Sequence, residues 1–335
     1  MAKKDIIVIG GSAGSYAPIR QIITGLPADL PVSVFITNHV PTHSTGYLSE
    51  ILEISSKLRV MRAVDGQPIE RGCVYVAVPD HHLLVVDGTI RLGNGPRENM
   101  SRPAIDPLFR SAALSYGPRV VGVVLSGMLN DGASGLNAIK ACGGTALVQY
   151  PLDALSDEMP LSALEAVEAD CIVPAAEIGG LIERFSAEDA AEEHHCPPNL
   201  PLEVEIAAGA RLGAAKLREI ADPSALSCPD CAGVLSEVTG EHPLRYRCQI
   251  GHAYTAEILA SRAKQVDEAL RIALRIMEER VTLVTRMGED ARRSGRQAVA
   301  DLYESRAAEY ARYAQVLREA AVTSMRTIAP VGEGD

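Results

Sequence analysis

A short apolar run followed by a glycine-rich turn opens the chain and constrains its fold more than any other feature. Ile6 to Ile9 are consecutive aliphatic residues, and Gly10-Gly11-Ser12-Ala13-Gly14 follows them directly. After this turn, apolar residues recur at helical spacing, at Ile19, Ile22, Ile23 and Leu26. The order predicts a buried strand, a sharp turn and an amphipathic helix.

The same alternation of strand and helix patterns continues to about residue 187. Helices are expected at 106–115 and from about residue 134, and residues 83–92 resemble a hairpin around the turn pair Asp87-Gly88. Further apolar strands are expected at 32–36, 74–78, 120–125 and 145–149. We therefore predict an α/β fold with a doubly wound, mostly parallel sheet.

Three polar residues follow the ends of predicted strands. Ser12 occupies the centre of a G-x-S-x-G motif between a strand and a helix, His39 closes the second strand, and Asp131 follows the strand at 120–125. Ligands of open α/β sheets bind outside the carboxyl ends of the strands, so these side chains are expected to converge. We predict Ser12 as nucleophile, His39 as general base and Asp131 as the acid that fixes the imidazole tautomer.

A glycine-rich turn between strand and helix is also typical of nucleotide sites. The fingerprint G-x-G-x-x-G fails here because Ser12 stands at the second glycine, and Asn38-His39 occupies the place of the expected acid. These departures favour a hydrolase. The order Ser, His, Asp differs from that of the α/β-hydrolases, so that fold is not expected. Asp80 is a rival acid, and Ser15 and Ser126 are rival hydroxyls for which we expect structural roles.

Four spaced segments resemble the chemotaxis protein-glutamate methylesterases. They are Ile-Gly-Gly-Ser-Ala-Gly at 9–14, Asn-His-Val-Pro at 38–41, Ser-Arg-Pro-Ala-Ile-Asp at 101–106 with Phe109 and 111–113, and Leu-Ser-Gly-Met-Leu-Asn-Asp-Gly at 125–132. The resemblance covers about residues 5–187. It implies hydrolysis of glutamate γ-methyl esters on the cytoplasmic helices of chemoreceptors, and deamidation of receptor glutamines.

The resemblance also assigns roles to further residues. It implies an oxyanion hole made by the backbone N–H groups of Ala13 and Met128, and it places Arg102 near the cleft, where it would meet acidic receptor surface. Three positions depart from the family: Ala13 replaces a common threonine, Leu129 a usual glycine, and Asn38 a usual glutamine. The family's N-terminal receiver domain has no counterpart before Ile6, so control by phosphorylation in cis is not expected.

A compact cysteine cluster lies beyond the α/β region. Cys228, Cys231, Cys248 and His252 form the pattern C-x2-C-x16-C-x3-H, which suits tetrahedral zinc in a closed, structural site. The alternative is a set of reduced thiols without a metal. Catalysis itself is expected to need no cofactor. Cys73, Cys142 and Cys171 are expected to be buried, inert thiols, and Cys196 a linker residue.

Composition shifts divide the chain into four predicted parts. These are a catalytic domain at 1–187, a linker at 188–222, a zinc-binding module at 223–255 and a helical hairpin at 256–325. The hairpin is expected from two apolar stripes, Leu270, Leu274, Met277, Val281 and Val284, then Leu302, Tyr310, Tyr313, Leu317 and Ala320. Self-association through this hairpin is a further expectation.

Charge and hydropathy exclude several classes of function. The net charge is −11, which argues against nucleic acid as a partner because phosphate binding needs a basic surface. No apolar run is long enough to span a membrane, and no signal-peptide core precedes the first strand, so a cytoplasmic protein is expected. Two rivals stay open: an esterase for a non-chemotaxis protein, and a signalling scaffold without catalysis.

Overall fold

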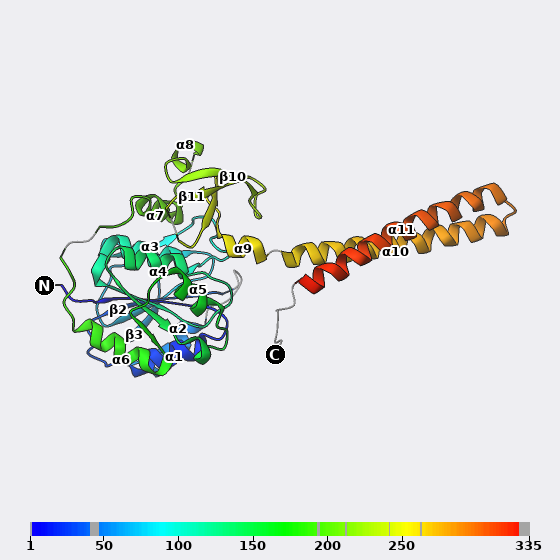
Figure 1. Cartoon of the computed structure of the whole chain (residues 1–335). Coiled ribbons are helices and arrows are strands. Elements are labelled where there is room, and N and C mark those ends of the chain that lie inside the picture. Colours follow the sequence, from blue (N-terminus) through cyan, green and yellow to red (C-terminus); the bar gives the residue numbers. More distant parts are fainter. Residues whose placement is uncertain are drawn as a thin grey trace, which may run out of the picture. The chain divides into compact units, whose positions relative to one another are not determined.

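Seven parallel strands form the central sheet of the computed structural model (Figure 1). The structure describes residues 2–40, 47–192, 195–211, 213–240, 242–261 and 263–327. Every neighbouring pair in the sheet is parallel, which confirms the predicted fold class. In spatial order the strands are β3 (Arg59–Arg62), β4 (Cys73–Val76), β2 (Ser33–Asn38), β1 (Ile6–Gly11), β7 (Val120–Val124), β8 (Thr145–Gln149) and β9 (Cys171–Val173).

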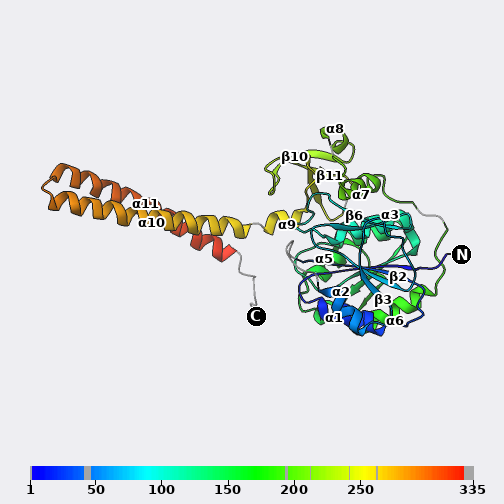
Figure 2. The ribbon, with the colours of Figure 1, turned by 180° about the vertical axis from the view of Figure 1, so that it is seen from behind.

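Helices cover both faces of this sheet, as Figures 1 and 2 show. One layer holds α1 (Tyr16–Gly25), α2 (Leu48–Ser55) and α6 (Ala175–Ser186), and the other holds α3 (Ile105–Tyr116), α4 (Ala133–Ala141) and α5 (Glu158–Ala166). Two short 3-10 helices span Gly117–Arg119 and Pro151–Asp153. Ile6 and Val8 of β1 belong to one hydrophobic core, and Ile7 and Ile9 belong to the other. A strand buried on both faces therefore has a continuous rather than alternating apolar pattern.

The hairpin predicted around Asp87-Gly88 is confirmed. β5 (His82–Val86) and β6 (Thr89–Gly93) pair antiparallel, and the two turn residues have φ of 44° and 81°. Both values lie in the left-handed region that a type I′ turn requires. The hairpin packs on α3 and is followed by the loop that precedes α3.

A second, four-stranded antiparallel sheet lies in the same compact unit, which extends over Met1–Leu259. Its strands in order are β10 (Ala221–Ser227), β11 (Val234–Val238), β12 (Arg245–Cys248) and β13 (Ala253–Thr255). Three helices flank it in sequence: α7 (Leu200–Ala208), α8 (Ala214–Leu217) and α9 (Ala256–Ser261). This sheet carries the whole cysteine cluster, and the division into four parts predicted above stays a prediction.

Part of the segment expected as a linker is packed helix. Leu200, Glu203 and Ile206 of α7 are buried, and α7 contacts α3, β5 and β6. Cys196, just before α7, forms a disulfide with Cys142 at the end of α4, with Cα atoms 4.7 Å apart. The expectation of an inert Cys142 thiol is therefore wrong, because the chain returns across α4 at this point. Cys73 and Cys171 are free; Cys73 is buried, whereas Cys171 is partly exposed.

The second unit, Ala260–Asp335, is a helical hairpin in the part that the structure describes. α10 (Ala263–Arg293) and α11 (Gln297–Thr327) pack against each other, and Gly295 has φ of 74° in the turn. The predicted stripe on α10 is partly buried throughout. On α11 the prediction was partly wrong, since Leu302 and Tyr313 are 50% and 47% exposed. None of the described helices is long and apolar enough to cross a lipid bilayer.

Candidate functional site

Ser12 lies in the turn that leaves the carboxyl end of β1. Its backbone N–H donates to Ser126 O at 2.9 Å, and Ser15 N–H donates to Ser12 O at 3.1 Å. The turn after β7 packs directly against it, because a Cβ added to Gly127 would lie 2.9 Å from Ser12 Cβ. The loops after two adjacent strands thus hold Ser12 between them. Ser12 itself stays half-buried.

His39 follows β2, the strand on the other side of β1. Its Nδ1 lies 3.2 Å from Ser12 Oγ, and its Nε2 lies 2.7 Å from Asp131 Oδ2. A carboxylate only accepts hydrogen bonds, so Nε2 carries the hydrogen and Nδ1 is left to accept the serine proton. The structure therefore brings all three predicted residues together at the carboxyl edge of β2, β1 and β7.

Asp131 is buried at 2% exposure and is surrounded by donors. Besides His39, it accepts hydrogen bonds from Ile105 N at 2.6 Å, Asp106 N at 3.2 Å and Asn99 Nδ2 at 2.9 Å. Burial by itself would raise the pKa of this carboxyl, but the bonds from His39, Ile105 and Asn99 hold its pKa below the ordinary value. Asp131 is thus anionic and faces the imidazole.

A second buried carboxyl, Asp106, stands beside Asp131. Asn99 Nδ2 donates to both, at 3.0 Å to Asp106 Oδ2 and 2.9 Å to Asp131 Oδ1. Burial first, and the neighbouring Asp131 charge second, raise the pKa of Asp106. Sequence reasoning missed Asn99. Its only signal was its place two residues before the segment at 101–106.

The predicted oxyanion donors have no competing partner in the described part of the chain. No hydrogen bond from the backbone N–H of Ala13 or Met128 joins another described residue. The rival hydroxyls are engaged instead: Ser126 Oγ donates to Ala13 O at 2.7 Å, and Ser15 Oγ donates to Asn38 Oδ1 at 2.5 Å. Both serines hold the turn around Ser12.

Arg102 is fixed by an acidic neighbour. Its Nη2 and Nε donate to Asp80 Oδ1 at 2.6 and 3.0 Å, and its Nη1 donates to Gly95 O at 3.0 Å. The Arg102 guanidinium lowers the pKa of Asp80. Among the described contacts no hydrogen bond or ion pair joins Arg102 to Ser12 or His39. The rival acid Asp80 thus forms an ion pair with Arg102. Among the described contacts it has none with the imidazole of His39.

Leu129, one of the departures from the family pattern, has φ of 64°. This is a left-handed conformation in which glycine is favoured. The leucine side chain packs against the hydrophobic cluster formed by Cys228, Leu235, Cys248, Tyr254 and Ile258. Leu129 therefore combines an unfavourable backbone conformation with a side chain that packs against the second sheet.

The four predicted metal ligands gather at one end of the second sheet. Their ligand atoms all lie within 4.8 Å of one another. Cys231 Sγ and Cys248 Sγ are 3.7 Å apart, and His252 Nδ1 lies 3.5 Å from Cys248 Sγ and 3.7 Å from Cys228 Sγ. Zinc–sulfur bonds of about 2.3 Å give a tetrahedron with edges of about 3.8 Å. The spacing of these four atoms therefore fits one tetrahedral ion.

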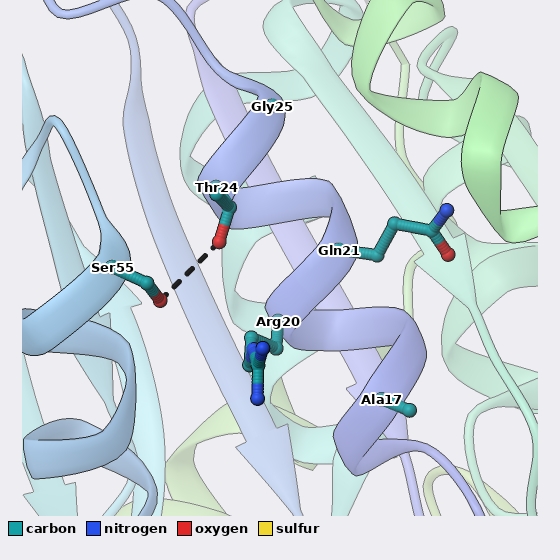
Figure 3. Close-up of a pocket in the computed structure, with 6 residues that line it drawn as sticks. All are labelled: Ala17, Arg20, Gln21, Thr24, Gly25 and Ser55. Carbon is teal, nitrogen blue, oxygen red and sulfur yellow. Dashed lines mark hydrogen bonds between the residues drawn. The ribbon is translucent and has the colours of Figure 1, made fainter.

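A separate surface hollow of about 580 Å³ lies along α1 and the end of α2 (Figure 3). Thr24 on α1 reaches toward Ser55, and their hydroxyl oxygens are 3.3 Å apart. The residues that line the hollow are Ala17, Arg20, Gln21, Thr24, Gly25 and Ser55. The lining contains no carboxylate, histidine or cysteine, so we assign this hollow no part in hydrolysis.

Comparison with known families and structures gives a consistent result. The sequence model of the family described as CheB methylesterase matches residues 7–182, more than half of the chain. The structure also resembles the crystal structure of the Thermotoga maritima CheB methylesterase catalytic domain. That match has a TM-score of 0.52 and 32% identity, and covers 55% of this chain and 98% of the solved domain.

Individual relatives match about half of the chain. A protein of Leptospira interrogans (serogroup Icterohaemorrhagiae, serovar copenhageni) is 39% identical over 182 residues, which are 54% of this chain and 94% of the relative. A protein-glutamate methylesterase/protein-glutamine glutaminase of Methanosarcina mazei is 36% identical over 179 residues, 51% of this chain and 49% of the relative. The chain thus spans nearly all of one relative and about half of the other.

Proposed function

The chain belongs to the CheB methylesterase family, and from this premise we propose that it hydrolyses glutamate γ-methyl esters on the cytoplasmic helices of chemoreceptors. The observation that carries the proposal is the chain of hydrogen bonds from Ser12 through His39 to Asp131. A half-buried hydroxyl, an imidazole and a buried carboxylate in this order are the parts that acyl transfer by a serine requires.

The first half of the reaction forms an acyl-enzyme. Ser12 Oγ attacks the ester carbonyl carbon while His39 Nδ1 takes the hydroxyl proton. The tetrahedral intermediate then collapses, the bond to the methoxy oxygen breaks, and His39 returns the proton so that methanol leaves. Throughout this half, the Asp131 carboxylate holds the imidazole and stabilises its positive charge.

The second half hydrolyses the acyl-enzyme. His39 Nδ1 takes a proton from water, whose oxygen attacks the same carbon, and Ser12 Oγ leaves with that proton. The products are a receptor glutamate and the free enzyme. A glutamine side chain would follow the same course with ammonia as the leaving group, so we include glutamine deamidation in the proposal.

Two backbone N–H groups, those of Ala13 and Met128, are proposed to stabilise the oxyanion. Each follows a residue packed at the site, since Ala13 comes after Ser12 and Met128 comes after Gly127. Donors without another partner in the described structure are ready to receive a developing negative charge. A methyl side chain at residue 13 leaves this backbone donor unchanged.

Arg102 is proposed as a binding residue for acidic receptor surface. Its side chain keeps 24% exposure beside Asp80, so part of the guanidinium can still meet a receptor carboxylate. Because this substrate lies on cytoplasmic helices, we place the enzyme in the cytoplasm. Self-association through the α10–α11 hairpin stays a prediction.

The cysteine cluster is proposed to hold one structural zinc ion. Four protein ligands close the coordination shell, so no position remains for a water or substrate and the site has no part in ester hydrolysis. The ion would link the turn at 228–231 to the turn at 248–252 and so fix β13, which begins at the next residue, Ala253.

The proposal is tested with the cytoplasmic region of a methylated chemoreceptor and mass spectrometry of its peptides. The expected result is loss of one methylene mass at methylated glutamates, with no such loss for the Ser12→Ala variant. Demethylation by the Ser12→Ala variant at the native rate would contradict the assignment of the nucleophile.

A further inference from the structure

The loop before α3 is hydrogen-bonded to the edge of the second sheet. Asn99 N donates to Ala253 O at 2.8 Å, and Ala253 N donates to Arg97 O at 3.3 Å. Glu98 and Ala253 form a parallel β-bridge. β13 is the last strand of its sheet, so residues 97–99 act as its next neighbour. Two segments about 150 residues apart in sequence thus pair through their backbones.

Asn99 uses its whole amide group between this strand and the candidate acid. Its Oδ1 accepts the backbone N–H of Thr255 at 3.3 Å, and its Nδ2 donates to Asp131 Oδ1 and Asp106 Oδ2. The residue is 5% exposed and has φ of 50°, a left-handed conformation that asparagine tolerates better than most residues. A neutral donor between two carboxyls reduces their mutual repulsion and fixes the orientation of Asp131.

β13 and the helix that follows it also bind Asn130, the residue before Asp131. Thr255 Oγ1 donates to Asn130 Oδ1 at 2.8 Å, and Asn130 Nδ2 donates to Glu257 Oε2 at 2.6 Å. Leu129, one residue earlier, packs on the hydrophobic cluster that contains three of the second sheet's own residues, Leu235, Cys248 and Tyr254. Leu129 and Asn130 therefore contact the second sheet directly. Asp131 is bonded to Asn99, which in turn is bonded to Thr255 of that sheet.

A buried charge network fixes this sheet to the α/β domain. Arg247 Nη2 on β12 pairs with Glu98 Oε1 at 3.0 Å and with Glu203 of α7, and Arg245 Nη2 pairs with Glu203 Oε2 at 2.9 Å. Arg110 of α3 pairs with Glu98. All five side chains are at most 2% exposed. Glu98 precedes Asn99 directly, so the network fixes the loop at the point where it reaches Asp131.

We propose that the second sheet is part of the support of the catalytic acid, with Asn99 as a positioning residue for Asp131 and β13 as the element that holds Asn99. The inference rests on the proposed function of Ser12, His39 and Asp131. It assigns the cysteine-cluster region a role inside the hydrolase: orientation of Asp131, and through it of His39, for proton transfer from Ser12.

The matched variants are Asn99→Ala, Asn99→Asp and the control Asn94→Ala, an exposed asparagine of the same connection. Asn99→Asp keeps the shape of the side chain but replaces a donor by an acid between two carboxyls. A packing role alone predicts that the aspartate is tolerated better than the alanine. A positioning role predicts that both impair the site, and that the aspartate is at least as harmful.

Two readouts separate this inference from the proposed function. The rate of Ser12 modification by a fluorophosphonate, followed by intact mass, reports activation of the nucleophile without a receptor. Methanol release from a methylated chemoreceptor gives kcat and KM. We expect Asn99→Ala to lower both the labelling rate and kcat about 10- to 100-fold with KM within about twofold, because misplacing a reacting group by about 1 Å can cost about 100-fold in rate.

The role of β13 is tested with Thr255→Val, and Thr239→Val serves as its control because Thr239 Oγ1 bonds only to Ile220 O in the described structure. We expect Thr255→Val to slow Ser12 labelling several-fold and Thr239→Val to leave the labelling rate unchanged. The inference is overturned if Asn99→Ala or Thr255→Val, folded with a native unfolding temperature, labels at the native rate. If Ser12 of the unmodified protein is labelled but no methanol is released, the proposed substrate is wrong. The role of Asn99 and β13 in positioning Asp131 would not be affected by that result.

Discussion

His39 Nε2 lies 2.7 Å from Asp131 Oδ2, so the carboxylate holds the imidazole from its Nε2 side and Nδ1 faces Ser12. In the trypsin-type triad the two nitrogens have the opposite partners. The chemical requirement is the same in both cases, because one nitrogen must carry a hydrogen for the acid and the other must accept the serine proton.

Replacing Asp131 by asparagine is expected to lower kcat about 10³- to 10⁴-fold. The asparagine amide can present a donor to Nε2, which would favour the tautomer with its hydrogen on Nδ1 and so remove the acceptor for Ser12. Steady-state methanol release measures the effect, with the surface variant Asp29→Asn as control. Unchanged turnover in Asp131→Asn would contradict Asp131 as the acid that holds His39.

Gly127→Ala is expected to impair both stability and turnover. The added Cβ would lie 1.9 Å from Met159 Sδ and 2.9 Å from Ser12 Cβ, so the turn must shift, at a cost of about 1–3 kcal/mol in the free energy of unfolding. Gly180→Ala in α6 is the matched control, since nothing lies within 4 Å of its added Cβ. Urea unfolding and methanol release measure the two effects, and native values for Gly127→Ala would show that the turn is not packed as described.

The buried charge network predicts a large cost for losing one carboxylate. Glu203→Gln leaves Arg245 and Arg247 short of a negative partner in the interior, and we expect a loss of about 3–5 kcal/mol in the free energy of unfolding. Glu205→Gln, an exposed change on the same helix, is expected to change it by less than about 0.5 kcal/mol. Equal effects of the two variants in urea unfolding would contradict a fixed attachment of the second sheet.

The same network predicts a dependence of stability on pH. Burial would raise the pKa of Glu98 and Glu203, but the surrounding arginines lower the pKa of both below the ordinary value of 4.5. Groups with a lowered folded-state pKa stabilise the protein above the unfolded-state pKa, and this stability is lost as the pH falls. The native unfolding temperature is expected to fall below about pH 4.5 more steeply than that of Glu203→Gln. Parallel curves would exclude Glu203 as a source of acid sensitivity.

Metal removal is expected to destabilise the second sheet and slow the chemistry together. Cys231→Ser should lose the bound zinc, unfold at a lower temperature and label Ser12 more slowly, because β13 loses its anchor at His252. Cys171→Ser, at a free cysteine outside the cluster, should keep all three properties. Purified native protein without zinc by metal analysis would contradict the structural site.

The sequence predicted the parts of the site that depend on strand ends. Ser12, His39 and Asp131 each follow a buried strand, and parallel strands bring their carboxyl ends to one edge whatever their separation in sequence. Asn99 and Glu203 could not be found in this way. Their roles depend on the second sheet packing against the loop before α3, a contact between distant segments that no local periodicity encodes.

The differences between these expectations and the structure have a similar origin. The segment at 188–222 has turn-forming and acidic residues typical of a linker, but Leu200 and Ile206 find an apolar surface on the α/β domain and form a packed helix. Cys142 and Cys196 looked unrelated for the same reason. On α11, Leu302 and Tyr313 match a helical stripe but are exposed, whereas the small residues Ala300 and Ala314 are buried.

The most direct test of the central claim is methanol release from a methylated chemoreceptor by the intact protein, compared with Ser12→Ala. We predict steady release by the native protein and none above background by the variant. Equal release by both would contradict Ser12 as the nucleophile, and no release by a native protein whose Ser12 reacts with a fluorophosphonate would contradict the chemoreceptor methyl ester as the substrate.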